Sequence, residues 1–600
     1  MDEDTMYEEC LDEAEEADQA DEEQAECTPQ GFFIDEDNYL WVGGDEPEKV
    51  GKAIIMSHVE SNIDTGDVTA HIGFEYRGEI RELDVPRERL ASKFLPELVG
   101  KGADCRADVA KIYEENLFKQ EETVKLINVH SKVGWRKVGG KTAFLHARGI
   151  GIKSRYVGGQ FDLGPSGTLE EWKQVIDEHV IGRPWLELML AAGLSSAVVG
   201  MLALRTSVNS LLFHIFNRTT TGKTTAIRVG LSPWGNPDST SNGLLRTWNG
   251  TDAGIAAHFR DNFGIAIGLD EASVRGEKQR QSASLVYQLA MGRDRDRLTG
   301  GSKRAETAEW ATTMISNAEH SILDFCGKNG GIRARMFEIG GIQWTDGPEH
   351  AEALTEGLLE HYGVAGPEFA RYLLDVGEEA VEELWKNQRE VMMAKLTAQD
   401  KLSARVVGKL AIIAITGAFA NAALDLSLDL ERLEDTLLLV ETMSQRERAE
   451  WARAYDDLKQ IVTTNNARFI NETFDRDKNA KIPSTLWGKF PRGKGGTEVN
   501  FIANPFKEAM KMKGYLNLDP IFDDWKRLGI LQHTEKDRFS TNRKIAGVDN
   551  EVFVIRLDFA DGSEETDDAG EEAPKPKVKV GSKRPVVRNR QAATEEDEEM

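Results

Sequence analysis

The chain has 600 residues, which is too long for one hydrophobic core and predicts several domains. Its formal net charge is −28, and the acidic excess gathers at the N-terminus, where residues 1–30 hold 14 acidic side chains and no Lys or Arg. A strongly negative net charge does not exclude binding to nucleic acid, because a groove can be basic within an acidic protein. The charge therefore leaves both nucleic-acid and protein partners open.

Cysteine usage and apolar runs limit the class of protein further. Cys10, Cys27, Cys105 and Cys326 are scattered without a CxxC pair, which argues against a disulfide scaffold or a zinc site and fits a reducing cytoplasm. The N-terminus is acidic from its second residue, so no signal peptide is expected. The nearest approach to a membrane span, residues 409–424, is short and Ala-rich and is expected to be a buried helix. We expect a protein of the bacterial cytoplasm with no membrane contact.

The first part of the chain predicts a tail and a small domain. Residues 1–30 are expected to be a disordered acidic tail, either simply solvated or docked on a protein partner. Residues 31–165 combine runs of alternating polarity with two amphipathic helices, which indicates a β-rich α+β domain. Gly139 and Gly140 predict a hairpin turn within residues 134–151. No catalytic constellation is visible in this region.

Helices are expected over residues 168–204, and then a phosphate-binding pattern begins. Residues 210–216 form an apolar run typical of a buried strand, and Gly222, Lys223 and Thr224 open a helical pattern after a polar loop. This is the P-loop layout GxxxxGK[ST], with Asn217 in place of the first Gly. Asn is a tolerable substitute, because it adopts positive φ more readily than most other residues.

The P-loop residue types suit ATP and Mg²⁺. Backbone N–H groups of the loop and the N-terminus of the next helix would cradle phosphate oxygens. Lys223 would reach the β- and γ-phosphates, and the Thr224 hydroxyl would hold Mg²⁺. The expected nucleotide-binding residues here are Asn217, Thr219, Thr220, Thr221, Gly222, Lys223, Thr224 and Thr225.

A second apolar run, residues 263–269, ends in Asp270 and Glu271, 47 residues after Lys223. This is a Walker B pattern, in which Asp270 would hold Mg²⁺ and Glu271 would polarise the attacking water. Strands and helices alternate over residues 207–345, which implies parallel strands joined by helical crossovers.

Further positions have the chemistry of assisting residues. Another buried strand ends near Asn317, where additional-strand P-loop ATPases place a polar residue (sensor 1) that positions the water. Arg335, with Arg333 as the alternative, precedes a later strand, where AAA+ proteins place an arginine finger that reaches the neighbouring subunit's nucleotide. Sensor 2 normally comes from a helical lid, and the sequence leaves Arg371 and Arg405 open for this role.

Residues 291–310 form a basic, Gly-hinged segment in the place where several hexameric helicases carry a pore hairpin. Arg297, Lys303 and Arg304 are expected to contact DNA phosphates. Asp294 and Asp296 alternate with arginines there, so a solvated, internally paired loop is the alternative.

The remaining segments predict a lid and a C-terminal module. Residues 346–449 are helical by pattern. Residues 450–559 indicate helices followed by a β-wing, a winged-helix-like module in which Lys536, Arg538, Arg543 and Lys544 could meet phosphates. Residues 560–600 mix acidic and basic runs and are expected to be a disordered tail.

Several motifs in order give the chain a resemblance to a known family. They are GWRKVGGKTAFLHARGIG, RPWLELMLAAGLSSAVVG, TTTGKTTAIRVGLSPWG, RTWNGTDAGI, LDEAS, SNAEHSI, RARMFEI and HYGVAGPEFARYL. Residues 31–430 resemble P-loop proteins of phages, plasmids and integrated elements that carry the label "superfamily II helicase and inactivated derivatives". Their relatives are AAA+ hexameric helicases of the minichromosome-maintenance-like or superfamily III kind. Despite that label, Lys223, Thr224, Asp270 and Glu271 are all present, so the chain looks competent for catalysis.

The resemblance implies an α/β protein. Its parts are an AAA+ core (residues 166–345), a helical lid (346–449), the β-rich N-terminal domain (31–165) and the winged-helix-like module (450–559). We expect an ATP- and Mg²⁺-dependent helicase or translocase, assembled as a homo-oligomeric ring, most simply a hexamer. It would act on a DNA strand or fork in replication of a phage or mobile element. The alternatives are an AAA+ loader, remodeller or defence switch that acts on a protein partner, and a nucleotide-binding scaffold without turnover.

Overall fold

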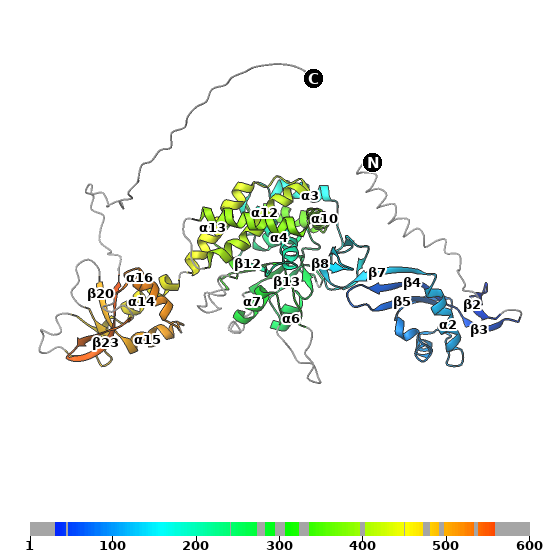
Figure 1. The fold of residues 1–600 in the computed structure, drawn as a ribbon, viewed down its shortest axis with the longest axis horizontal. Coiled ribbons are helices and arrows are strands. Elements are labelled where there is room, and N and C mark those ends of the chain that lie inside the picture. The colour runs from blue at the N-terminus through cyan, green and yellow to red at the C-terminus, as the bar shows by residue number, and fades with distance from the viewer. Residues whose placement is uncertain are drawn as a thin grey trace, which may run out of the picture. The chain divides into compact units, whose positions relative to one another are not determined.

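The computed structural model describes residues 31–43, 46–240, 242–272, 282–294, 307–322, 335–396, 402–448, 450–471, 481–490, 497–515, 517–532 and 538–557. These residues fall into two compact units. The first holds residues up to Leu458 together with Glu508–Asp524, and the second holds Lys459–Lys507 and the residues from Trp525 onward. The elements are drawn in Figure 1.

The N-terminal part of the first unit is rich in strands, as its alternating pattern predicts. A three-stranded sheet is formed by β1 (Phe32–Ile34), β2 (Tyr39–Val42) and β3 (Glu48–Lys52). A five-stranded sheet has the order β11-β7-β4-β5-β6, from β4 (Ile54–Asn62), β5 (Val68–Tyr76), β6 (Glu79–Pro86), β7 (Lys125–His130) and β11 (Arg155–Tyr156). Helix α2 (Ala110–Glu121) packs on β4 and buries Tyr113 and Leu117 against Met56 and Phe74. Two short 3-10 helices, Arg87–Leu90 and Leu95–Lys101, precede α2.

The predicted hairpin is confirmed, but it belongs to a second core. Strands β8 (Val133–Val138) and β9 (Lys141–Leu145) meet at Gly139 and Gly140, which have φ of 55° and 81°, as a tight hairpin turn requires. β9 continues to β10 (Gly149–Ile150), and β8 pairs with β14 (Asn262–Phe263). Trp135 and Phe144 are fully buried with the central helices. The hydrophobic core therefore changes near residue 130 rather than at 165.

The central sheet is wholly parallel, as the strand-helix alternation predicts. Its order is β13-β15-β16-β12-β17, from β12 (Leu211–Phe216), β13 (Leu245–Thr247), β15 (Ile267–Asp270), β16 (Thr313–Ala318) and β17 (Phe337–Gly340). Figure 1 shows helices above and below this sheet. They are α3 (Leu169–His179), α4 (Pro184–Ala203), α5 (Lys223–Leu231), α6 (Asp252–Ala257) and α7 (Ser282–Met291). β16 thus lies between the strand that leads into the P-loop and the strand that ends in Asp270.

Two apolar helices form the centre of the second core. By length and composition α4 and α12 (Ser403–Leu424) could each cross a membrane, but 94% and 67% of their apolar windows are buried inside the protein. A helix that is apolar all round is what a core demands, so both are explained as core helices. The sequence-based expectation had singled out only residues 409–424. α4 lies so close to α5 that a Cβ on Gly193 would be 1.9 Å from the carbonyl oxygen of Gly230.

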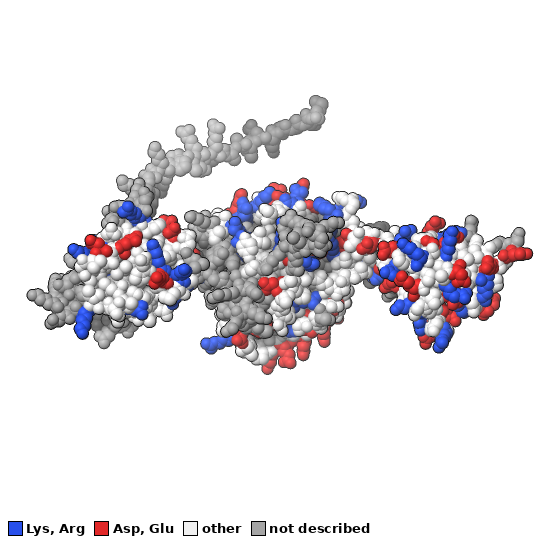
Figure 2. All heavy atoms as spheres, turned by 90° about the horizontal axis from the view of Figure 1, so that it is seen from below, with Lys and Arg blue, Asp and Glu red and all other residues white. Residues whose placement is uncertain are grey.

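The later helices share this core instead of forming a separate layer. They are α9 (Pro348–Glu360), α10 (Ala365–Val376), α11 (Glu378–Lys395), α12 and α13 (Leu430–Arg448). α12 packs on α4, α10, α11 and α13. On the face drawn in Figure 2, the described Lys and Arg side chains are interspersed with Asp and Glu.

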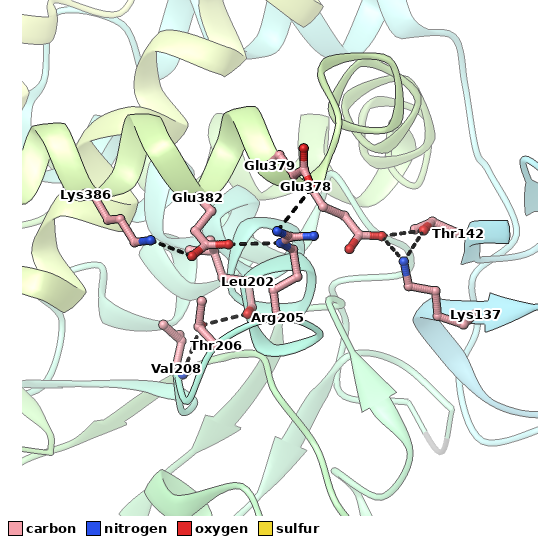
Figure 3. A network of polar contacts seen from close by, with 10 residues as sticks. All are labelled: Lys137, Thr142, Leu202, Arg205, Thr206, Val208, Glu378, Glu379, Glu382 and Lys386. Atoms are coloured by element: carbon pink, nitrogen blue, oxygen red, sulfur yellow. Dashed lines mark hydrogen bonds and ion pairs between the residues drawn. The ribbon is translucent and has the colours of Figure 1, made fainter. Parts of the chain in front are cut away.

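A network of ion pairs joins the hairpin, the end of α4 and the start of α11 (Figure 3). Lys137 Nζ lies 2.5 Å from Glu378 Oε1, which also accepts a hydrogen bond from Thr142. Arg205 pairs with Glu382 at 2.9 Å and with Glu379 at 3.4 Å, both on α11. The network therefore ties elements together that lie more than 200 residues apart in the sequence.

The second unit contains one antiparallel-rich sheet. Its order is β18-β19-β20-β23-β21, with β22 also paired to β23. The bounds are β18 (Phe469–Ile470), β19 (Gly488–Lys489), β20 (Thr497–Ile502), β21 (Leu531–Gln532), β22 (Thr541–Ile545) and β23 (Val548–Leu557). The helices of the C-terminal region are α14 (Glu450–Thr464), a 3-10 turn at Asn466–Arg468, α15 (Ala503–Met512) and α16 (Asp519–Arg527). β22 and β23 form a hairpin, with a turn at Ala546 and Gly547.

Candidate nucleotide-binding site

The P-loop follows β12 at the carboxyl edge of the central sheet. Gly222 has φ of 79° and caps α5, and Thr220 has φ of 65°. The positive φ expected at Asn217 is not found there. Instead, its amide nitrogen donates to the Ile342 carbonyl at 3.0 Å, and its Oδ1 accepts from the Arg218 backbone N–H at 2.8 Å. Asn217 therefore fixes the start of the loop through its carboxamide and not through its backbone conformation.

The P-loop curls around the Lys223 ammonium. Lys223 Nζ donates to the carbonyl oxygens of Asn217 and Arg218, each at 2.8 Å. Desolvation is the largest influence and lowers the pKa of Lys223, while the nearby carboxylates Glu271, Glu319 and Asp270 act in the opposite direction. The ammonium is thus held by two loop carbonyls, next to the N-terminus of α5, which is a favourable place for a phosphate group.

Three strand ends meet beside the lysine. Thr224 Oγ1 lies 3.4 Å from Asp270 Oδ1 at the end of β15. Asn317, buried near the end of β16, donates from Nδ2 to Thr224 Oγ1 at 3.3 Å and accepts the Glu271 backbone N–H at 2.8 Å. The structure thus brings together Lys223, Thr224, Asp270, Glu271 and Asn317, as the sequence predicts.

Glu271 has an unusual backbone conformation. Its φ is 59°, in the left-handed region that non-Gly residues seldom occupy. The residue is exposed and follows directly after the last residue of β15. Such strain tends to persist where surrounding contacts hold it, and here the hydrogen bond to Asn317 holds the Glu271 N–H. The turn ends the strand at the residue whose carboxylate is the expected water-polarising group.

The oxygen pair Thr224–Asp270 fits a magnesium ion. Mg²⁺ prefers oxygen ligands at about 2.1 Å in an octahedron, which puts neighbouring ligand atoms about 3 Å apart. The observed 3.4 Å separation is close to that spacing. Thr224 and Asp270 are therefore the residues that would hold Mg²⁺.

Residues 344–345 also contact the P-loop, and no sequence pattern predicts this. The backbone N–H of Trp344 donates to the Thr221 carbonyl at 2.9 Å. A Cβ added to Gly222 would meet two atoms of the Thr345 side chain at 2.7 Å. The Gly222 position thus requires glycine on grounds of φ and of space. On α5 itself, Thr225 Oγ1 lies 3.1 Å from Thr355 Oγ1 of α9.

Arg335 lies at the opposite edge of the sheet. In the parallel register Phe337 pairs with Phe213, so Arg335 is six strand positions before the level of Asn217, or roughly 20 Å at about 3.3 Å per residue. Its guanidinium lies 4.5 Å from the ring centroid of Tyr287 and donates to the Tyr287 hydroxyl at 3.3 Å. Arg335 is therefore too far from its own P-loop to contact a phosphate bound there.

The two lid arginines lie in different places. Arg371 is exposed on α10 and pairs with Glu368 one turn earlier. α10 begins beside Pro233 and Trp234, at the end of α5 remote from the P-loop. Arg405, at the start of α12, is close enough to the ammonium of Lys409 to influence its pKa, as is Arg335. Arg405 therefore belongs to the edge that carries Arg335.

Five expected site residues lie outside the described residues. They are Arg333, Arg297, Lys303, Arg304 and Lys536.

Lys409 is a residue that sequence reasoning missed. Its ammonium donates to the carbonyls of Ser210 at 3.1 Å and Arg335 at 3.4 Å, and so joins the start of β12 to the segment that carries Arg335. Burial, with the nearby guanidinium groups of Arg335 and Arg405, lowers the pKa of Lys409 to about 7. A helical pattern does not indicate that a lysine within it will be buried between the ends of two strands that are distant in the sequence.

Comparison with known proteins gives two family matches and a structural one. Residues 43–307 match the family described as a domain of unknown function (DUF927), and residues 451–560 match a "Cch helix turn helix domain". No curated protein matches. A solved structure, "SCCmec type IV Cch - active helicase", is similar with a TM-score of 0.70 and 22% identity. The similarity covers 88% of this chain and 97% of that one. The chain therefore shares the mixed α/β fold of that structure over most of its length.

The lowered pKa of Lys409 predicts a pH dependence of stability. Between pH 7 and 10.5 the unfolded chain binds the proton that the folded chain releases, so the free energy of unfolding rises with pH in this window. Replacing Lys409 by Met should remove this contribution. We expect the Tm of the wild type to rise relative to that of Lys409→Met between pH 7 and 9. Differential scanning calorimetry measures both.

The matched control is Lys111→Met, which removes an exposed lysine from α2. It should follow the wild type at each pH. Parallel pH dependence in wild type and Lys409→Met would show that the Lys409 ammonium is solvated.

Proposed function

We propose that the chain is an ATP-dependent, ring-forming DNA translocase or helicase of the AAA+ class, which acts in replication of a phage or mobile element. The observation that carries this proposal is the meeting of Lys223, Thr224, Asp270, Glu271 and Asn317 at one edge of a parallel sheet. The strand order supports the additional-strand class, because β16 lies between the P-loop strand and the Asp270 strand.

ATP would bind on the P-loop with its phosphates against the loop amides and the N-terminus of α5. The lysine would exchange the carbonyls of Asn217 and Arg218 for phosphate oxygens, which attract a cation more strongly. Thr224 and Asp270 would hold a Mg²⁺ ion, which would supply charge neutralisation during phosphoryl transfer. The remaining loop residues, Thr219, Thr220 and Thr221, would contribute backbone groups.

Hydrolysis requires an oriented water on the far side of the γ-phosphate. Glu271 is the group proposed to polarise it, because the turn after β15 frees its carboxylate from the sheet. Asn317 is proposed to fix both partners, since it bonds the Glu271 N–H and the Thr224 hydroxyl. Loss of Asn317 would therefore alter the positions of the base and of the metal ligand together.

Arg335 is proposed to serve the nucleotide of a neighbouring subunit. It is roughly 20 Å along the sheet from its own P-loop, and an arginine side chain spans less than half of that. A guanidinium supplied from the next protomer stabilises the charge of the transition state. Arg405 lies at the same edge and would join it, with Arg333 as the alternative finger. This arrangement favours a closed ring, for which a hexamer is the simplest proposal.

DNA is the proposed partner for three reasons. The C-terminal residues match a helix-turn-helix family, and the similar solved structure is that of an active helicase. Arg543 and Lys544 are exposed on β22, with Arg538 before it. The main DNA contacts are assigned to the basic segment with Arg297, Lys303 and Arg304, because contacts to phosphates require positive charge.

The arginine finger is tested by mixing two inactive variants. Lys223→Ala has no working P-loop but supplies Arg335, and Arg335→Ala has an intact P-loop but no finger. Each alone should lose about 10³-fold or more in ATP turnover. In a ring of equal mixture about one interface in four pairs an intact P-loop with an intact finger, so turnover should return in part. The measurement is steady-state phosphate release at constant total protein.

A finger that acts within its own chain predicts no recovery on mixing. Lys386→Ala, an exposed lysine on α11, is the control variant and should keep full turnover.

A loader, remodeller or switch acting on a protein is the second candidate, and charge reversal separates it from the first. Lys303→Glu with Arg304→Glu should abolish the stimulation of ATP hydrolysis by single-stranded DNA while leaving the basal rate. This follows because phosphate contacts require positive charge. The assay is phosphate release with and without DNA. Unchanged stimulation, or none in the wild type, would favour the protein substrate.

A further inference from the structure

A group of metal-ligand side chains lies on the N-terminal sheet, far in sequence from the P-loop. His58 and Glu60 come from β4, and His71 comes from β5. One ligand atom of each residue lies within 4.8 Å of the others. The Glu60 residue is only 8% exposed, although it is a carboxylate. A buried acid beside two imidazoles requires an explanation in terms of charge.

The strand register builds this group on the sheet face opposite α2. His71 is paired with His58 on one side and with Asp84 of β6 on the other. A bulge in β4 between Met56 and His58 shifts the alternation, so that Met56 and Val59 both face the core. The same bulge turns His58 and Glu60 to the outer face. Bulges commonly re-aim side chains at functional positions.

Hydrogen bonds fix the tautomer of His58. Ser57 Oγ donates to the His71 carbonyl at 3.3 Å and therefore accepts from His58 Nδ1 at 3.0 Å. His58 Nε2 is then a bare lone pair, 4.0 Å from Glu60 Oε1. In this tautomer the ring can ligate a metal through Nε2.

His71 is oriented in the same way. Its Nδ1 lies 2.7 Å from Asp84 Oδ1, and a carboxylate can only accept, so Nδ1 carries the proton. Its Nε2 is buried without a hydrogen bond, although Glu60 Oε2 is 3.3 Å away. A lone pair and a carboxylate that face each other without a bond repel unless a cation lies between them. The two rings are stacked with centroids 4.0 Å apart, and the Nε2 atoms of both rings lie near the Glu60 carboxylate.

The geometry points to a zinc site. We propose that His58 Nε2, His71 Nε2 and the Glu60 carboxylate bind Zn²⁺, with the fourth coordination position open to solvent or to a partner group. Tetrahedral ligands at about 2.0–2.1 Å lie about 3.3–3.4 Å apart, close to the observed His71–Glu60 separation. Asp84 and Arg155, which bind His71 and Glu60 respectively, are positioning residues outside the metal's own ligands.

The charge balance agrees with a divalent cation. Besides the two imidazoles, the group holds two carboxylates, Glu60 and Asp84, and one guanidinium, Arg155. The carboxylates therefore outnumber the guanidinium before any metal binds. The site would clip β4 to β5 and is independent of the proposed ATPase function. The cysteine spacing gave no hint of it, because these ligands are histidine and glutamate.

The test uses the full-length chain, stripped with a chelator and dialysed. Wild type should bind about one Zn²⁺ in competition with a chromogenic chelator, and Co²⁺ should give the visible absorption of a tetrahedral N/O site. His71→Gln and His58→Gln should each weaken binding by more than about 100-fold, and Asp84→Asn by about 10- to 100-fold. ATP hydrolysis is not the readout, so failure here and failure of the ATPase proposal are distinguishable.

His179→Gln is the matched control, since its ring is 19% exposed against 18% for His71, and it should bind zinc like the wild type. Circular dichroism checks that each variant is folded. If His71→Gln does not fold, the zinc affinity of His58→Gln provides the test. Equal zinc affinity in wild type and a folded His58 or His71 variant would overturn the proposal. So would a wild type that binds no zinc.

Discussion

The carboxamide of Asn317 joins two segments that the rest of the nucleotide site depends on. It accepts the N–H of Glu271 and donates to the hydroxyl of Thr224, so one side chain sets the distance between the P-loop helix and the end of β15. This is possible because β16 is inserted between β12 and β15. The same side chain lies beside the Thr224–Asp270 oxygen pair, which is 3.4 Å apart.

A parallel sheet also separates two kinds of chemistry. Its carboxyl edge gathers Lys223, Asp270 and Glu271, while its amino edge holds Arg335 and Lys409. If the nucleotide site requires Arg335 as well as the residues at the carboxyl edge, the simplest source of that arginine is a second copy of the chain. The lysine at the amino edge bonds two backbone carbonyls and thereby fixes the Arg335 segment to the start of the P-loop strand.

The sequence predicted the parts of the site that local patterns encode. The P-loop and the Asp270–Glu271 pair each follow directly after an apolar strand, so strand and chemistry are contiguous and readable. Asn317 followed from the same logic at the next strand. Parallel pairing was predictable from the alternation of strands and helices. The hairpin at Gly139 was predictable because its turn needs two residues with positive φ.

Other features depend on long-range packing and carry no local signal. The conformation of Asn217 was misjudged because its partner, Ile342, is 125 residues away. A helical pattern places Arg371 on a helix but does not say which end of α5 that helix meets. The zinc ligands are spread over two strands, and a bulge decides which face they share. If the pairing of β4 with β5 were known, His58 and Glu60 opposite His71 would indicate the site.

The central claim is that ATP is bound by the P-loop and cleaved with the help of Glu271. Its most direct test is ATP turnover and bound nucleotide in wild type and Glu271→Gln, since the amide keeps the shape of the side chain and removes its charge. The account predicts that the wild type hydrolyses ATP and that the variant retains ATP uncleaved, with turnover at least about 10²-fold lower. Equal turnover in the two proteins, or a wild type that binds no ATP, would contradict it.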